Sequence, residues 1–191
     1  MPTKIDSKNF LIGGIILLLM ILIGGIFTLC KTFNKNITAE NNCFIPSQKT
    51  VSGSSMMPVF SHGDVITSLI GYYDCNEIDR GDFVLADYGG ASFDLVLKTV
   101  RGVPNDTFTL KQNGVGWNII INDQVLMNHS GVAYSLPEYS ANILKSYQHQ
   151  SNGVVPEGKY LLFGEMIEGS YDSTKAGFFA REQIIAKVLP K

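Results

Sequence analysis

The sequence predicts one mostly β domain that follows a single N-terminal membrane helix. A long uncharged apolar block near the N-terminus indicates the helix, and short β-branched and apolar runs between turn residues indicate the strands. We expect a polar tail over residues 1–9, a transmembrane helix over residues 10–30, a linker over residues 31–50 and a β-rich domain over residues 51–191. The bilayer is therefore the first expected partner.

The apolar block contains no charged residue between positions 10 and 30. At about 1.5 Å of rise per residue, a helix of this length spans about 30 Å, the thickness of a bilayer core. A cleaved signal peptide has a shorter apolar region followed by a small-x-small site, whereas this block ends in Phe27-Thr28-Leu29-Cys30. We expect the helix to remain uncleaved. Its orientation is not assigned by charge, because lysines flank it on both sides, at Lys4, Lys8, Lys31 and Lys35.

Alternation, β-branched residues and turn pairs predict the strands of the β-rich part. The expected strands cover residues 65–70, 82–86, 94–100, 107–112, 118–121, 159–163 and 184–188. Asn113-Gly114 and Asn122-Asp123 predict tight hairpin turns, because these residue types tolerate positive φ. No long amphipathic helical pattern is found in this part of the chain.

Composition limits the function classes. The chain has 191 residues, 45% of them hydrophobic, which suits one core, and a net charge of −2 without a basic run excludes a nucleic-acid partner. The three cysteines, Cys30, Cys43 and Cys75, form no CxxC or Cys/His cluster, so we expect no metal and no cofactor. Cys43 and Cys75 are compatible with a disulfide in an oxidising compartment and equally with two free thiols.

The segment Val51-Ser52-Gly53-Ser54-Ser55-Met56-Met57-Pro58 places hydroxyl groups beside a flexible glycine. Pro58 restricts Met57 to extended backbone, so the serines are expected on a loop or strand end. On its own this pattern also describes a polar turn before a buried methionine pair.

Lys98 lies in the apolar strand expected over residues 94–100. If its side chain points outward, it is a solvated edge charge. If it points inward, burial lowers its pKa, and lowering it to about 7 corresponds to about 4 kcal/mol of disfavoured charging. A neutral amine accepts a proton from a serine hydroxyl, so Lys98 and a serine would suffice for acyl transfer without histidine.

Four segments, in this order, resemble the conserved boxes of the signal peptidase I family. They are Gly53-Ser54-Ser55-Met56-Met57-Pro58, Arg80-Gly81-Asp82-Phe83-Val84, Lys98-Thr99-Val100-Arg101-Gly102-Val103-Pro104-Asn105-Asp106 and Gly164-Glu165-Met166-Ile167-Glu168-Gly169-Ser170-Tyr171-Asp172-Ser173. The resemblance covers about residues 48–190. It implies a signal-peptidase-type β domain and a serine endopeptidase that acts on preproteins.

The resemblance also implies roles for individual residues. Ser55 would be the nucleophile and Lys98 the general base, and the backbone N–H of Ser55 would donate to the oxyanion. Ser170 would hydrogen-bond and orient the Lys98 amine, while Asp172 and Ser173 would support that corner structurally.

Some positions depart from the family pattern. Gly53 stands where many members carry a second, hydroxyl-bearing oxyanion donor, so that donor is unassigned. Glu165 replaces Asp, Thr99 replaces the Arg beside the base, and Thr174 replaces the Arg that follows the Asp172 corner. Asp172 would then need another ion-pair partner, for which Lys175 and Arg101 are the candidates.

The expected function is therefore that of a single-pass endopeptidase of the plasma (inner) membrane, with its catalytic domain on the outer or periplasmic side. Substrates would be signal peptides of exported proteins or, since Ser170-Tyr171-Asp172-Ser173 looks similar to the conjugative-transfer subtype, pilin-like precursors of a secretion or conjugation apparatus. The alternative is a non-catalytic, membrane-anchored binding module. A Ser-His-Asp triad is not expected, because His62, His129 and His149 lack a supporting motif.

Overall fold

The computed structural model describes residues 43–89, 95–167 and 169–190. The predicted tail, the predicted membrane helix over residues 10–30 and most of the predicted linker lie outside these residues. Within the described part, no helix is long and apolar enough to cross a membrane.

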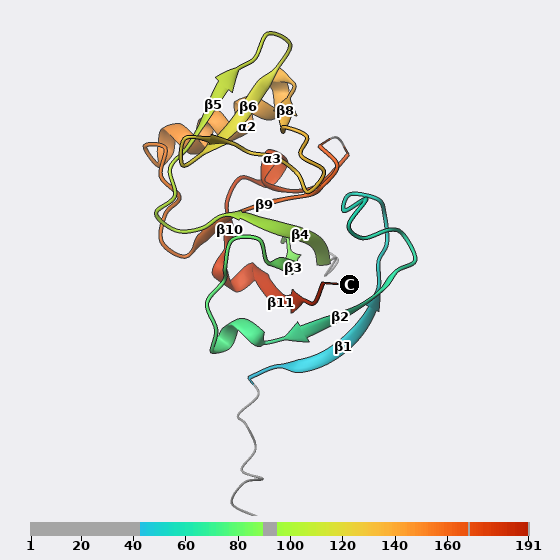
Figure 1. The fold of residues 1–191 in the computed structure, drawn as a ribbon. Coiled ribbons are helices and arrows are strands. Elements are labelled where there is room, and N and C mark those ends of the chain that lie inside the picture. Colours follow the sequence, from blue (N-terminus) through green and yellow to red (C-terminus); the bar gives the residue numbers. More distant parts are fainter. Residues whose placement is uncertain (1–42, 90–94, 168, 191) are drawn as a thin grey trace, which may run out of the picture. The chain divides into compact units, whose positions relative to one another are not determined.

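An antiparallel sheet holds most of the described strands (Figure 1). Among the described residues it contains seven strands in the order β1-β2-β11-β3-β4-β9-β10. Their bounds are Ile45–Thr50 (β1), Val65–Ile70 (β2), Phe83–Asp87 (β3), Leu95–Gly102 (β4), Lys159–Phe163 (β9), Phe179–Ala180 (β10) and Ile184–Val188 (β11). The predicted strands at 65–70, 82–86, 94–100, 159–163 and 184–188 match β2, β3, β4, β9 and β11 to within two residues, and the predicted mostly β class is confirmed.

A smaller sheet is formed by the segment between β4 and β9 (Figure 1). Its strands are Phe108–Gln112 (β5), Trp117–Ile121 (β6), Gln124–Val125 (β7) and Ser135–Leu136 (β8). Both predicted hairpin turns are confirmed: Gly114 has φ 94° between β5 and β6, and Asn122 and Asp123 have φ 48° and 63° between β6 and β7.

The predicted linker boundary at residue 50 is wrong. Residues 45–50 form β1, which pairs with β2 along its whole length, so the β domain begins before residue 51. β1 lies at the edge of the sheet and only Ser47 is even partly buried, so the strand carries the polar composition of a linker. The expectation of a linker failed because an edge strand with two exposed faces needs no apolar alternation.

A helix is present in this part, although the sequence shows no long amphipathic pattern there. Glu138–Gln150 forms α2, which packs beside the smaller sheet. Only Ala141 and Leu144 of this helix are buried, so its apolar stripe is narrower than the usual amphipathic pattern. A second, short helix, α3, covers Ser173–Ala176.

β9 joins the two parts of the core. Leu161 and Phe163 pack with α2 and the smaller sheet, whereas Tyr160 and Leu162 pack within the larger sheet's core. Alternate side chains of a strand point to opposite faces, which lets one strand serve both clusters. The segment after β9 is therefore attached to a strand that is packed on both faces.

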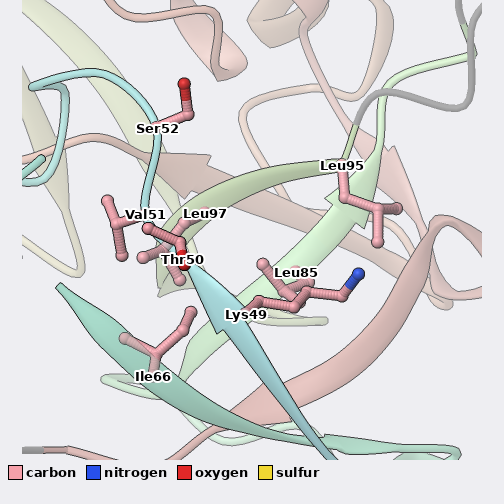
Figure 2. A pocket seen from close by; sticks show the side chains of 8 residues that line it. All are labelled: Lys49, Thr50, Val51, Ser52, Ile66, Leu85, Leu95 and Leu97. Atoms are coloured by element: carbon pink, nitrogen blue, oxygen red, sulfur yellow. The ribbon is translucent and has the colours of Figure 1, made fainter. Parts of the chain in front are cut away.

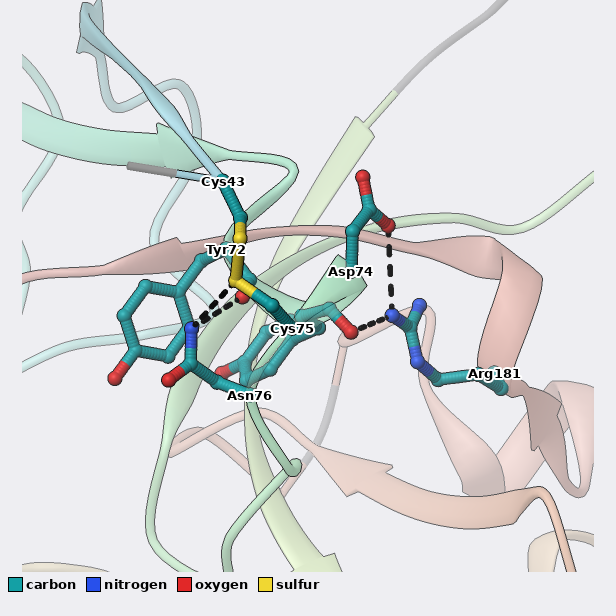
Figure 3. Close-up of a disulfide and its surroundings, with 7 residues drawn as sticks. Cys43, Tyr72, Asp74, Cys75, Asn76 and Arg181 are labelled. Atoms are coloured by element: carbon teal, nitrogen blue, oxygen red, sulfur yellow. Dashed lines mark hydrogen bonds and ion pairs between the residues drawn. A yellow bond between two sulfur atoms is a disulfide. The ribbon is translucent and has the colours of Figure 1, made fainter. Parts of the chain in front are cut away.

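A disulfide joins Cys43 to Cys75 across a sequence separation of 32 residues, with a Cα–Cα distance of 6.1 Å (Figure 3). Of the two states that the sequence allowed, the structure contains the disulfide. Cys75 directly follows the 3-10 helix η1, Tyr72–Asp74, and the Asn76 amide donates to its Sγ at 3.6 Å. The link fastens the start of β1 to the far end of β2, and the loop that carries Ser55 lies between the two cysteines.

Candidate active site

Ser55 lies on the loop that connects β1 to β2, as its flanking Gly and Pro predicted. The neck of the loop is closed by a hydrogen bond from Val51 N to Asp64 O at 2.8 Å. Met56 and Phe60 are 2% and 0% exposed and anchor the loop in the core. Because the residue next to Ser55 is buried, Ser55 itself is held at the boundary between core and solvent, where it is half-buried.

Lys98 points into the protein from β4 and is 2% exposed. Its strand is held in register by pairing with Val84 of β3. The Lys98 amine lies 3.1 Å from Ser55 Oγ and donates to the carbonyl oxygen of Leu97 at 2.7 Å. Of the two orientations that the sequence allowed, the inward one is observed.

Burial changes the acidity of this amine. Desolvation lowers the pKa of Lys98 from 10.5 to about 8, while the nearby Asp172 carboxylate acts in the opposite direction and raises it. At mildly alkaline pH a substantial fraction of the amine is neutral. A neutral amine within hydrogen-bond distance of a serine hydroxyl is able to accept its proton.

The backbone of Ser55 is held from the other side by the segment after β9. Its carbonyl oxygen accepts hydrogen bonds from Glu165 N at 2.7 Å and Met166 N at 2.9 Å. A Cβ on Gly164 would lie 2.8 Å from this oxygen and 2.5 Å from Ser170 Oγ, so the close approach requires glycine at 164. The glycine of the last family-like box therefore permits the contact between the box and the Ser55 loop.

Asp172 and Ser173 fasten the corner beside Gly164. Asp172 accepts from Gly164 N at 3.0 Å and caps α3 by accepting from Thr174 N at 3.0 Å and Thr174 Oγ1 at 2.7 Å. Ser173 Oγ accepts from Leu162 N of β9 at 2.8 Å. Both side chains are buried, and their bonds hold this corner against β9.

The expected ion-pair partners of Asp172 are wrong. Neither Lys175 nor Arg101 pairs with it in the described part of the chain. Thr174, the residue that departs from the family pattern, supplies a hydroxyl and a backbone N–H instead. Thr174 therefore takes over the role of binding the Asp172 carboxylate.

The expected hydrogen bond from Ser170 to Lys98 is absent. Ser170 is 2% exposed and its Oγ has no hydrogen-bond partner among the described residues. The Lys98 amine bonds instead to Leu97 O of its own strand and to Ser55 Oγ. Ser170 packs against Gly164, which keeps its hydroxyl in the neighbourhood of the site.

Glu165, which we noted only as a departure, connects the strand of Lys98 to the Ser55 loop. Its side chain is buried and accepts from Thr99 Oγ1 at 2.9 Å, from Arg101 at 3.0 Å and from His129 N at 2.8 Å. Burial by itself acts to raise the pKa of Glu165, but the bonds from His129 and the charge of Arg101 outweigh it and the pKa is lowered. Glu165 is therefore an ionised carboxylate whose oxygens accept hydrogen bonds from all three of these residues.

Tyr134 is a further residue that the sequence reasoning missed. It is 1% exposed, lies just before β8, and its hydroxyl donates to the carbonyl oxygen of Gly164. No motif marks it, because a tyrosine in an apolar run reads as a core residue.

No Ser-His-Asp triad is found among the described residues. Gly53 has φ 90° and its N–H donates to His62 Nδ1 at 3.2 Å. His129 pairs with Glu165, and no histidine of the described residues hydrogen-bonds to the Ser55 hydroxyl. The same residues contain no cluster of side chains able to hold a metal ion.

A groove of about 420 Å³ lies between β1 and β4 (Figure 2), and its lining includes Leu97, the neighbour of Lys98 in the sequence. Aliphatic side chains form most of its wall, namely Val51, Ile66, Leu85, Leu95 and Leu97. Lys49, Thr50 and Ser52 complete the lining. The outer edge of β1 and the edge of β4 opposite β3, over residues 95–98, have no strand partner among the described residues. The groove is thus an apolar channel between two open strand edges.

The β domain thus brings a serine hydroxyl and a buried lysine amine together. The family model described as "Signal peptidase, peptidase S26" matches residues 15–190. The chain therefore belongs to the signal peptidase S26 family, which makes it a serine endopeptidase whose substrates are preproteins.

The chain is also similar to individual proteins. Signal peptidase IB of Staphylococcus aureus (strain COL) is 30% identical over 149 residues, 76% of each chain. The probable signal peptidase I-2 of Synechocystis is 25% identical over 149 residues, 75% of this chain and 62% of that relative. A crystal structure of a signal peptidase I from Enterococcus faecalis V583 is similar with a TM-score of 0.41 and 19% identity, covering 60% of this chain and 98% of that one.

Proposed function

We propose that this protein is a membrane-anchored signal peptidase in which Ser55 is the nucleophile and Lys98 the general base. The observation that carries the proposal is the 3.1 Å distance between Lys98 Nζ and Ser55 Oγ, made by a lysine that is 2% exposed. A buried lysine without a carboxylate bonded to it is costly to keep charged, so a purely structural role explains it poorly. Family membership as a serine endopeptidase argues against the non-catalytic binding module.

The amine is oriented for proton transfer. A neutral amine has two N–H groups and one lone pair, and the bond to Leu97 O at 2.7 Å uses one N–H. The lone pair then faces Ser55 Oγ and takes the hydroxyl proton as the oxygen attacks the substrate carbonyl. The Ser55 N–H makes no hydrogen bond within the described part and is the proposed donor to the oxyanion.

The reaction then proceeds through an acyl-enzyme. The Lys98 ammonium gives its proton to the leaving amine, and the amino-terminal part of the substrate remains esterified to Ser55. A water that loses its proton to Lys98 attacks this ester, and the proton returns to Ser55 as the ester breaks. Ser170, Asp172 and Ser173 act as supporting residues, with Asp172 adjusting the pKa of Lys98.

The substrate would bind as an extended strand in the groove. The open edges of β1 and of residues 95–98 of β4 offer backbone groups to it, and alternate substrate side chains would point into the aliphatic wall. We expect small side chains to fit against this wall near Ser55. This arrangement supports cleavage after a small residue.

We place the protein in the plasma membrane, anchored by residues 10–30, with the β domain on the outer side where cleavage sites of exported proteins emerge. The uncharged apolar block supports the anchor. Signal peptides of exported proteins are the proposed substrates. The segment Ser170-Tyr171-Asp172-Ser173 supports pilin-like precursors of a secretion or conjugation apparatus as the second substrate class.

The test uses the full-length protein in detergent micelles with a signal-peptide-bearing precursor and, separately, a pilin-type precursor. Ser55→Ala and Lys98→Ala are compared with wild type, and Ser54→Ala serves as the matched control, because Ser54 is an exposed neighbour of Ser55. We expect cleavage after a small residue by wild type and the control, and loss by at least about 10³-fold in the two site variants.

Retained activity in Lys98→Ala would remove Lys98 as the base. Activity in Ser55→Ala with loss in Ser54→Ala would move the nucleophile. A preference for one precursor over the other decides between the two substrate classes.

A further inference from the structure

The segment that follows β9 contains two peptide groups that both donate to the carbonyl oxygen of Ser55. The N–H of Glu165 shares a planar peptide group with the carbonyl of Gly164, and the N–H of Met166 shares one with the carbonyl of Glu165. The two nitrogen atoms lie 2.7 Å and 2.9 Å from Ser55 O. The orientation of each peptide plane therefore decides whether its N–H points at Ser55.

A side chain from the stretch between β7 and β8 is bonded to the carbonyl oxygen of each of these peptide groups. The Tyr134 hydroxyl donates to Gly164 O, and the Asn128 amide donates from Nδ2 to Glu165 O at 3.1 Å. A trans peptide group has its C=O and N–H on opposite sides, so a bond at the oxygen fixes the direction of the N–H. The two side chains thus hold, at their far ends, the two groups that bind Ser55.

Packing alone does not explain these two polar groups. Tyr134 is 1% exposed, and its ring packs on Phe163 with a centroid distance of 5.5 Å. Phenylalanine would pack there without the cost of burying a hydroxyl. Asn128 is half-buried, and its Oδ1 already accepts from two backbone N–H groups of its own turn, at 3.0 Å and 2.9 Å. The Tyr134 hydroxyl and the Asn128 Nδ2 therefore serve the segment after β9.

We infer that Tyr134 and Asn128 are positioning residues for cleavage, which hold Ser55 in place through the two peptide groups that bind its carbonyl oxygen. The inference rests on the proposed function, because it takes Ser55 as the nucleophile. Rotation of either peptide group would release the Ser55 carbonyl and let the backbone turn, which moves the hydroxyl away from the Lys98 amine and out of its attack geometry. The smaller sheet thereby supports the reaction through the backbone of Ser55.

The experiment measures kcat and KM of the full-length protein in detergent micelles on a signal-peptide-bearing precursor. Tyr134→Phe removes the hydroxyl and keeps the ring, and Asn128→Asp removes the Nδ2 donor and keeps the Oδ1 acceptor. The matched controls are Tyr139→Phe and Asn142→Asp, which make the same chemical changes at exposed positions of α2. Urea unfolding under the assay conditions gives the folded fraction of each variant, so that kcat is expressed per folded molecule. Ser55→Ala reports on the proposed function separately.

We expect kcat per folded molecule to fall about tenfold in Tyr134→Phe and at least about tenfold in Asn128→Asp, with KM within about twofold of wild type and no change in the two controls. Wild-type kcat in folded Tyr134→Phe overturns the inference and leaves the proposed function intact, and so does a rise in KM without a fall in kcat. If Tyr134→Phe shows no cooperative unfolding, Asn128→Asp decides by the same criterion. Absence of cleavage by wild type, or cleavage by Ser55→Ala at the wild-type rate, overturns both.

Discussion

The amine of Lys98 and the hydroxyl of Ser55 lie 3.1 Å apart although the two residues are 43 positions apart in the sequence. Two independent restraints produce this contact. The core holds the Ser55 loop through Met56 and Phe60, and β3 holds the strand of Lys98 by backbone pairing. The pair therefore has little freedom to separate without disturbing the core.

The pH dependence of cleavage should follow Lys98. Because the base works when neutral and its pKa is about 8, kcat/KM should rise with pH through about 8 and level off above it. Asp172→Asn removes a charge that raises this pKa, so its rate profile should shift to lower pH. Asp123→Asn, in a distant turn that also accepts Asn, is the control. An unshifted profile in Asp172→Asn would contradict the electrostatic coupling.

Replacing the buried lysine should stabilise the fold. The lowering of the Lys98 pKa from 10.5 to about 8 corresponds to about 3 kcal/mol of disfavoured charging. Lys98→Met should therefore raise the free energy of unfolding by about 3 kcal/mol at pH 7 and abolish cleavage. The sign is set by the depressed pKa: below pH 8 the amine is charged in both states and the cost is fully present, and it disappears as pH rises from 8 to 10.5. Urea unfolding of wild type and Lys98→Met at pH 7 and pH 10 measures this difference, and a constant difference would contradict it.

The carboxylate of Glu165 should matter for both stability and rate. Glu165→Gln leaves the Arg101 charge poorly compensated in a mostly buried position, and we expect a loss on the order of 3 kcal/mol. The backbone N–H groups of Glu165 and Met166 donate to the Ser55 carbonyl oxygen, so loss of the side-chain bonds that hold this segment should also lower kcat. Thr99→Val, which removes one hydrogen bond, should cost about 1 to 2 kcal/mol.

Glu182→Gln, at an exposed position on the 3-10 helix η2, Arg181–Gln183, is the control for Glu165→Gln. Equal unfolding midpoints and equal rates for Glu165→Gln and Glu182→Gln would refute the linking role of Glu165.

A methyl group at position 164 should damage the site directly. In Gly164→Ala the new Cβ would lie 2.5 Å from Ser170 Oγ and 2.8 Å from Ser55 O, so the Ser55 backbone must move. A displacement of about 1 Å at a reacting group typically costs about a hundredfold in rate. Gly114→Ala is the control: it strains a positive φ on a hairpin tip and should lower stability by about 1 kcal/mol without changing kcat.

The disulfide should stabilise the region that carries Ser55. Closing a loop of 32 residues is worth about 3 to 4 kcal/mol in the chain-entropy description. Replacing both Cys43 and Cys75 by Ser should lower the urea midpoint by a corresponding amount, and reductant should do the same to wild type. The double variant should not respond to reductant; a response would place the sensitivity elsewhere.

The sequence by itself determined the features that local chemistry controls. Apolar runs predicted β2, β3, β4, β9 and β11, and Asn-Gly and Asn-Asp pairs predicted two hairpin turns, because strand and turn preferences act over a few residues. The ordered boxes around Ser55, Lys98 and Gly164 predicted the family, which the family match confirms. β1 and α2 were not predicted, because an edge strand and a helix with a narrow apolar face bury too few residues to show an apolar pattern in the sequence.

Only the tertiary structure decided which groups meet. The sequence is equally compatible with Lys98 as an exposed charge at a strand edge, and the pairing of β4 turns its side chain inward. Ser170 packs on Gly164 and does not reach the Lys98 amine. Thr99 and Glu165 read as separate departures until the fold joins them by a 2.9 Å hydrogen bond. Such contacts depend on the direction of side chains from elements far apart in the chain, and local preferences carry no information about that direction.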